Sequence, residues 1–257
     1  MFTVVIPARF GSTRLPGKAL LPIAGKPMLQ WVHERARASK ARDVFVATDD
    51  ERIAKVAQGF GASVVMTDAT HASGTDRIAE VSRTLQWSAD EIVVNVQGDE
   101  PLMPPTLINQ VAEVLELHAS AAIATLAAPV LSIEEFLDPN AVKVVTDLQG
   151  RALYFSRAPI PWDRDGALSG GATRQSYAEA RRHLGLYAYR VGALQQIAAL
   201  KPSSLEQREK LEQLRALENG FEIRLVNATE RPGQDVNTPE DLERVIAQVS
   251  TQASRQG

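Results

Sequence analysis

Residues 4–18 read Val-Val-Ile-Pro-Ala-Arg-Phe-Gly-Ser-Thr-Arg-Leu-Pro-Gly-Lys, a run of strand-forming residues followed at once by a basic loop. The loop carries two glycines, two hydroxyls and the cations Arg9, Arg14 and Lys18. Glycines let a backbone close around an anion and turn its N–H groups inward, while fixed cations supply countercharge. Because an open α/β sheet binds its ligand at the carboxyl ends of its strands, this stretch predicts such a sheet with a polyphosphate cradle.

The loop differs from two well-known phosphate-binding motifs. A P-loop has four residues between its first glycine and Gly-Lys, which Ser or Thr follows. Here five residues separate Gly11 from Gly17, and Ala19 follows Lys18. No G-x-G-x-x-G follows the first strand, which argues against a dinucleotide site. The alternative is an ordinary basic surface loop, but its position directly after a buried strand favours phosphate binding.

The composition is that of a globular protein with room for one large domain or one domain with an added lobe. The chain has 257 residues, of which 44% are hydrophobic and 23% charged. A formal net charge of −3 argues against a general nucleic-acid binder, although a locally basic pocket stays compatible with it. Because the chain has no cysteine, disulfides, thiolate zinc sites and cysteine nucleophiles are excluded.

The start of the chain leads directly into a strand, without a charged leader and a long apolar region. No run approaches the ~20 apolar residues that a membrane-spanning helix needs. We therefore expect a cytoplasmic enzyme with no membrane partner.

Strands and helices alternate in the first half of the chain. The apolar patterns predict strands at 44–47, 63–66 and 92–96, and helices at 27–38, 51–60, 75–85 and from 105 to about 115. Such alternation is typical of βαβ units. It predicts an α/β fold with a mostly parallel sheet flanked by helices.

The rhythm changes after a strand at 122–126, where the pattern indicates a smaller α+β lobe at about 130–220. A β-hairpin is predicted from 142–146 and 152–156, and residues 158–182, rich in Pro and Gly, are expected to be mobile or to cover a site. A strand at 186–189, a helix to about 200, a helix at 205–219, a strand at 222–226 and a final helix from Thr238 follow. With no repeat and no clear linker, residues 1–257 are expected to form a single domain that includes this lobe.

Two further segments carry candidate chemistry at the same sheet edge as the basic loop. Asp99 follows the fourth strand, and Mg²⁺ prefers one or two carboxylates together with phosphate oxygens. The alternative is that Asp99 caps a turn. Residues 73–77, Ser-Gly-Thr-Asp-Arg, open a helix whose N–H groups could meet an anion or a base. The alternative is that Ser73 or Thr75 is a helix cap and Arg77 is solvated.

Six motifs in order resemble one family over about residues 2–247, at 6–18, 73–77, 96–101, 153–162, 183–187 and 211–215. They are similar to those of the 3-deoxy-manno-octulosonate cytidylyltransferases, the CMP-Kdo synthetases of Gram-negative lipopolysaccharide synthesis. The resemblance implies a nucleotide-diphospho-sugar transferase-like domain whose lobe binds the sugar and forms a homodimer. It implies that the anomeric hydroxyl of 3-deoxy-manno-octulosonate (Kdo) attacks the α-phosphate of CTP, giving CMP-Kdo and pyrophosphate.

The resemblance also implies residue roles, by position. Catalysis would fall to Arg9, Lys18 and Asp99. The nucleotide would be bound by Pro7, Ala8, Arg9, Ser12, Arg14, Lys18, Arg77 and Gln97. The Kdo pocket would be lined by Arg157, His183, Tyr187, Glu212 and Gln213. As alternatives, His183 and Tyr187 could pack at the edge of the core, and Glu212 and Gln213 could be solvated.

The chain departs from the family at its second metal ligand, the aspartate of a Val-Asp-Thr-Pro-Glu-Asp motif. Here Asn237 takes that place, and Asp235 stands two residues earlier. Residues two apart in an extended chain face the same side. Asn237 and Asp235 are therefore alternative partners of Asp99 for Mg²⁺, with Asn237 favoured by position and a weaker hold on the metal expected.

Two competing functions remain open at this point. One is a cytidylyltransferase for another acidic sugar, such as an amino-Kdo or a sialic acid, because pocket specificity can depend on single contacts. The other is a non-catalytic nucleotide-binding module, which only Asn237 favours.

Overall fold

The computed structural model describes residues 1–11, 15–71, 73–164 and 177–254. Its main sheet contains nine strands, of which seven lie in the spatial order β11-β7-β10-β6-β1-β4-β5. They span β1 Phe2–Ala8, β4 Asp43–Thr48, β5 Ser63–Met66, β6 Ile92–Asn95, β7 Ile123–Pro129, β10 Arg181–Arg190 and β11 Ile223–Asn227. Among these seven strands, only β10 runs antiparallel to its neighbours β6 and β7. The predicted α/β class with a mostly parallel sheet is confirmed.

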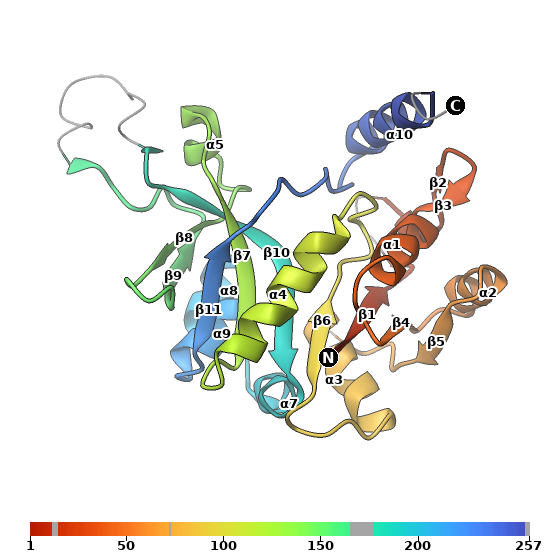
Figure 1. The fold of residues 1–257 in the computed structure, drawn as a ribbon, viewed down its shortest axis with the longest axis horizontal. Coiled ribbons are helices and arrows are strands. Elements are labelled where there is room, and N and C mark those ends of the chain that lie inside the picture. The colour runs from red at the N-terminus through yellow and green to blue at the C-terminus, as the bar shows by residue number, and fades with distance from the viewer. Residues whose placement is uncertain (12–14, 72, 165–176, 255–257) are drawn as a thin grey trace.

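Helices cover both faces of the sheet, as Figure 1 shows. The bounds are α1 Met28–Arg37, α2 Glu51–Gly59, α3 Gly74–Thr84, α4 Pro105–Leu117 and α7 Val191–Ala199. Alternation along β1 divides the core, because Val4 and Ile6 pack with α1, α2 and α4 whereas Val5 packs with α3 and α7. The result is a three-layer arrangement with two apolar cores.

The residues predicted to form the lobe begin after β7, and they include β10, a central strand of the main sheet. They also include α5 Ile133–Leu137 and a hairpin of β8 Lys143–Thr146 and β9 Ala152–Ser156, which joins the main sheet where β8 pairs with the start of β10. Figure 1 shows the hairpin and α5 at one side of the molecule. The predicted hairpin is confirmed, and β10 is longer than the predicted strand at 186–189. Residues 165–176 of the segment predicted to be mobile lie outside the described residues.

The prediction of one helix at 205–219 is wrong. The structure has two short helices, α8 Ser204–Glu209 and α9 Gln213–Glu218. Lys210 ends α8 with a φ of 55°, in the left-handed region that stops a right-handed helix. The break turns Glu212 and Gln213 toward the sheet instead of continuing one amphipathic rod.

The chain returns from the lobe through β11 to α10 Pro239–Ser254, which lies over the loop region near the first strand (Figure 1). Val236 and Val245 pack there against Ile23, Met28 and Leu102. The 3₁₀ turn at Lys18–Leu20 and the small strands β2 Pro22–Ile23 and β3 Lys26–Pro27 lie in this region. The crossing segment thus brings residues 235–237 beside the basic loop. In the part of the chain that the structure describes, every helix is too short or too polar to span a bilayer.

Candidate active site

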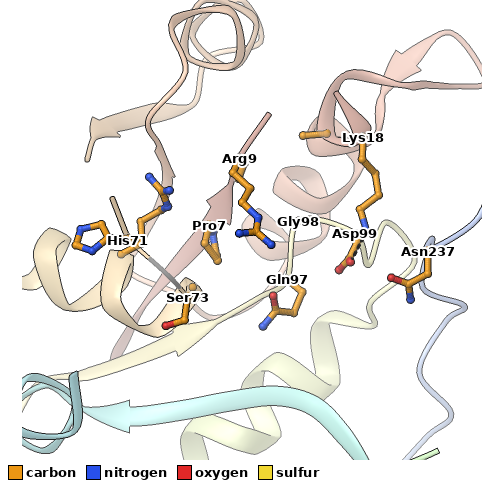
Figure 2. A pocket seen from close by; sticks show the side chains of 13 residues that line it. Pro7, Arg9, Lys18, His71, Ser73, Gln97, Gly98, Asp99 and Asn237 are labelled. Carbon is orange, nitrogen blue, oxygen red and sulfur yellow. Dashed lines mark hydrogen bonds and ion pairs between the residues drawn. The ribbon is translucent and has the colours of Figure 1, made fainter. Parts of the chain in front are cut away.

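A cavity of about 280 Å³ opens at the carboxyl ends of β1 and β6, where the sequence places the phosphate cradle. Figure 2 shows its lining side chains converging from the sheet edge, the start of α3 and the C-terminal crossing segment. The lining residues are Pro7, Ala8, Arg9, Lys18, Ala19, His71, Ser73, Gly74, Arg77, Gln97, Gly98, Asp99 and Asn237. Among the predicted nucleotide-binding residues, Ser12 and Arg14 lie outside the described residues.

Lys18 and Asp99 meet at one end of the cavity (Figure 2). The Lys18 ammonium donates to Asp99 Oδ2 at 2.6 Å and to the backbone oxygen of Val236 at 2.8 Å. The Val236 N–H in turn donates to the Asp99 carbonyl at 2.9 Å. The two side chains are 17% and 25% exposed, so water screens their attraction less than that of a surface pair. Three segments far apart in the sequence are joined at this point.

Gly98 allows β1 and the loop after β6 to approach closely. A Cβ on this residue would lie 3.0 Å from the carbonyl oxygen of Pro7, tighter than side chains normally pack. The glycine thus lets Gln97 and Asp99 flank the end of β1, next to Arg9, as Figure 2 shows. Because Gly98 stands between the predicted site residues Gln97 and Asp99, the sequence alone could have identified it as part of the site.

Arg77 is buried, so the alternative of a solvated side chain is wrong. It donates to the Thr67 hydroxyl, and its guanidinium lies 3.5 Å from Asp49 Oδ1. A fixed, partly neutralised guanidinium at the cavity wall presents donors without moving. Ser73 is the cap of α3, as the alternative stated, and it also lines the cavity.

Several lining residues were not singled out from the sequence. His71, whose Nε2 contacts the Glu80 carboxylate, lies at the opposite end of the cavity from Lys18 (Figure 2). Ala19 contributes a small side chain to the wall, and Gly74, which belongs to the predicted segment 73–77, contributes backbone. The position of Ala19 and His71 in the loop regions after β1 and β5 is the signal that could have identified them.

Several side chains with oxygen atoms that could bind a metal ion lie near Lys18. Asn237 lines the cavity with Asp99, and its side-chain amide donates to the Asp235 carboxylate. Glu100 Oε2 is buried without a hydrogen-bond partner. Burial, together with the charges of Asp99 and Asp235, raises the pKa of Glu100 to about 8. Within the described residues no three His, Cys, Asp or Glu side chains come close enough to form a metal-binding group by themselves.

The residues predicted to line the sugar pocket lie on the lobe side, outside the lining of this cavity. Arg157 is held by backbone oxygens, donating from Nε to Glu209 at 2.6 Å and from a terminal nitrogen to Pro139 at 2.8 Å. Its backbone N–H donates to the Glu209 carboxylate at 2.9 Å. These bonds tie β9 to α8, so Arg157 has a structural role in the described conformation.

His183 and Tyr187 lie on β10 with ring centroids 5.2 Å apart, and Phe155 meets His183 edge-on. Burial lowers the pKa of His183 to about 3, which keeps the imidazole neutral. The Thr125 hydroxyl lies 3.0 Å from His183 Nε2 and 2.8 Å from the Leu186 carbonyl. Because a carbonyl only accepts, we assign the hydroxyl proton to Leu186 and the imidazole proton to Nε2. These contacts match packing at the core edge, the alternative stated above.

Glu212 and Gln213 are not solvated. Gln213 is 9% exposed, and Glu212 Oε1 lies 2.8 Å from the hydroxyl of Ser73. Burial raises the pKa of Glu212, which the hydroxyls of Ser73 and Thr75 oppose. Glu212 therefore connects the lobe with a residue that lines the cavity.

A parallel sheet with a basic loop, a carboxylate and a helix N-terminus at one edge defines a nucleotide-binding transferase site. Residues 3–224 match the family model described as cytidylyltransferase. The chain belongs to the cytidylyltransferase family.

Individual relatives narrow the comparison. A 3-deoxy-manno-octulosonate cytidylyltransferase of Thioalkalivibrio sulfidiphilus is 58% identical over 95% of this chain and 97% of its own. One of Pseudomonas fluorescens is 55% identical over 95% of this chain and 96% of its own. The resemblance predicted from the six motifs is confirmed, and with it the class of nucleotidyltransferase enzymes.

Comparison with solved structures supports the same family. A CMP:2-keto-3-deoxy-manno-octonic acid synthetase complexed with CTP superposes with a TM-score of 0.88 and 40% identity, over 98% of this chain and 100% of the other. A cytidylyltransferase from Leptospira borgpetersenii, with a TM-score of 0.60 and 17% identity over 99% and 96% of the two chains, shares the fold.

Proposed function

We propose that this protein transfers CMP from CTP to the anomeric hydroxyl of Kdo with Mg²⁺, giving CMP-Kdo and pyrophosphate for lipopolysaccharide synthesis. The observation that carries the proposal is the meeting of Lys18 and Asp99 in a cavity at the carboxyl ends of β1 and β6. Relatives with more than half of their residues identical bear the corresponding name.

The reaction joins two anions, so its activation free energy depends mainly on countercharge and on the positions of the reacting groups. The anomeric oxygen forms a bond to the α-phosphorus, the bond from that phosphorus to the bridging oxygen breaks, and pyrophosphate leaves with the electron pair. The proton of the hydroxyl is lost to solvent or to a nearby base. Arg9 and Lys18 would bind the phosphates, and Pro7, Ala8, Arg77 and Gln97 would surround the cytidine.

The donor set suits a hard cation. Asp99 and Asp235 offer carboxylates and Asn237 an amide oxygen, and the buried Glu100 oxygen beside them has no hydrogen-bond partner. Asp99 and one of Asp235 or Asn237 would hold Mg²⁺. When bound, the ion would polarise the phosphoryl group and neutralise charge that develops on the leaving pyrophosphate.

The acceptor would lie toward the lobe, between the cavity and β10. His183, Tyr187, Glu212 and Gln213 are the candidates to contact it, with Arg157 setting the position of α8. Because His183 is neutral and Glu212 is bonded to Ser73, these side chains favour a polyhydroxylated ligand over a purely anionic one.

Pyrophosphate release from CTP, Mg²⁺ and Kdo, with each component omitted in turn, tests the proposal. We expect release only with all three. Release with another acidic sugar, such as an amino-Kdo or a sialic acid, would keep the chemistry and change the acceptor. Binding of CTP without release with any sugar acid would contradict the enzymatic role and leave a nucleotide-binding module.

We also propose a homodimer in the cytoplasm, formed through the lobe. Leu131, Leu137 and Trp162 are 55%, 53% and 63% exposed there, an apolar surface that a second copy would cover. Light scattering of the purified protein tests this, with Leu137→Asp expected to shift the mass toward the monomer. An unchanged monomer mass in the wild type would contradict the dimer.

A further inference from the structure

The hydroxyl of Ser73 lies between two carboxylates. It is 2.9 Å from Asp76 Oδ2 and 2.8 Å from Glu212 Oε1, although Glu212 is 139 residues away in the sequence. Ser73 and the following Gly74 line the nucleotide cavity, whereas Glu212 comes from the lobe at the start of α9. The contact therefore bridges the two halves of the proposed site.

The single proton of the Ser73 hydroxyl cannot make a full hydrogen bond to both carboxylates. The Ser73 oxygen accepts from the Asp76 N–H at 3.2 Å and has a single proton to donate. Asp76 also accepts from the Ser73 N–H at 3.2 Å and lies at the positive end of α3, and both features favour its ionised form. A full hydrogen bond between the second carboxyl group and the same hydroxyl needs a proton on that carboxyl group, and burial favours the neutral form at Glu212.

The other groups around Glu212 are compatible with this assignment. Burial is the main cause that raises its pKa, and the charge of Asp76 adds to it. The hydroxyls of Ser73 and Thr75 oppose the rise, and so does Arg215, but the Arg215 guanidinium is held by two bonds of 2.6 and 2.8 Å to Glu206. Tyr187 and Tyr189 face Glu212 from β10 as neutral phenols, because burial raises both of their pKa values.

We propose that Glu212 is a positioning residue that docks the lobe on the nucleotide-binding helix α3 by donating a carboxylic-acid proton to the Ser73 hydroxyl. The bond fixes the position of Ser73 and Gly74, which form part of the wall of the nucleotide cavity, relative to the lobe that would bind the acceptor sugar. Loss of the proton leaves two carboxylates competing for one hydroxyl, and the wall loosens. The consequence for catalysis rests on the proposed function, whereas the docking itself does not.

Infrared difference spectroscopy tests the proton directly, without substrates. The wild type minus Glu212→Gln spectrum should show the C=O band of a protonated carboxylic acid, which disappears as the pH is raised. Glu100→Gln is the control, since it removes a second buried acid and should affect a different band. Identical acid bands in wild type and Glu212→Gln, over the whole pH range in which both are folded, would overturn the proposal.

Amide hydrogen exchange tests the docking. Glu212→Ala should speed exchange in the first turn of α3, residues 74–77, whereas Glu212→Gln should not, because its amide still donates to Ser73. The KM for CTP should rise about 2- to 10-fold in Glu212→Ala with a smaller change in kcat, the effect of one lost hydrogen bond. It should also rise with pH in the wild type but stay level in Glu212→Gln.

Glu212→Gln behaving like Glu212→Ala in exchange would overturn the proposal. The spectra and exchange rates need no turnover. They therefore remain decisive even if the protein transfers CMP to no sugar.

Discussion

Lys18 shows how much one side chain can contribute at this site. Its ammonium bonds Asp99 and the Val236 carbonyl, so it is preorganised beside the cavity. We expect Lys18→Met to lower kcat/KM by about 10²- to 10³-fold, as for loss of one preorganised donor to a developing charge. Pyrophosphate release measures this. Lys55→Met, at an exposed position on α2, is the matched control and should leave the rate unchanged. Equal rates in both variants would contradict the role of Lys18.

His183 makes a pH-dependent contribution to stability. Its folded pKa of about 3 lies below the usual value of about 6.5, so the unfolded chain binds the proton more readily. The contribution is therefore fully present above about pH 6.5 and is lost as the pH falls toward 3. Between about pH 6.5 and pH 4.5 the loss is about 2 to 3 kcal/mol.

Urea unfolding over this pH range checks the sign and size of the effect. His183→Gln lacks the titrating group, and its free energy of unfolding should fall less steeply with decreasing pH than that of the wild type. Parallel curves for the two proteins would show that His183 is exposed to protonation in the folded state.

At the scale of the elements, the break between α8 and α9 is the feature that positions Glu212. Lys210 sustains it with a φ of 55°, which costs a residue with a side chain more than it costs glycine. We expect Lys210→Gly to raise the free energy of unfolding by about 0.5 to 1 kcal/mol. Denaturant unfolding measures it. Arg208→Gly, inside α8, is the control and should destabilise by about 1 kcal/mol. Destabilisation by both glycines would mean that Lys210 is not strained.

At the scale of the whole molecule, the segment between β11 and α10 closes the site. Gly233 lies against Leu102, where a Cβ would be 2.6 Å from the backbone oxygen of that residue. Gly233→Ala should displace the segment, destabilise the fold by about 1 to 3 kcal/mol as overpacking does, and raise the KM for CTP.

Thermal unfolding and steady-state kinetics check this expectation. Gly59→Ala is the control, because open space surrounds that position and alanine favours the α2 helix in which it lies. A Gly233→Ala variant as stable and active as the control would show that the crossing segment does not shape the cavity.

The sequence by itself determined the parallel half of the fold. Its strands and helices are local, since each is bounded by its own caps and glycines and each has a clear apolar period, as in α2 between Asp50 and Gly61. The order of elements then brings the loop after β1 and Asp99 to one sheet edge without any further information. The motifs that resemble the cytidylyltransferases belong to this same local level.

Only the tertiary structure decided what depends on distant partners. Three such features have no counterpart in the apolar periodicity of the sequence. They are the left-handed backbone of Lys210, the burial of Arg77 beside Asp49, and the hydrogen bond from Lys18 to the Val236 carbonyl. The neutral state of His183 follows from the residues that surround it rather than from its neighbours in sequence. The physical reason is that burial and charge act through space: a pattern predicts which face of an element is apolar, but not which side chain from 139 residues away will meet it.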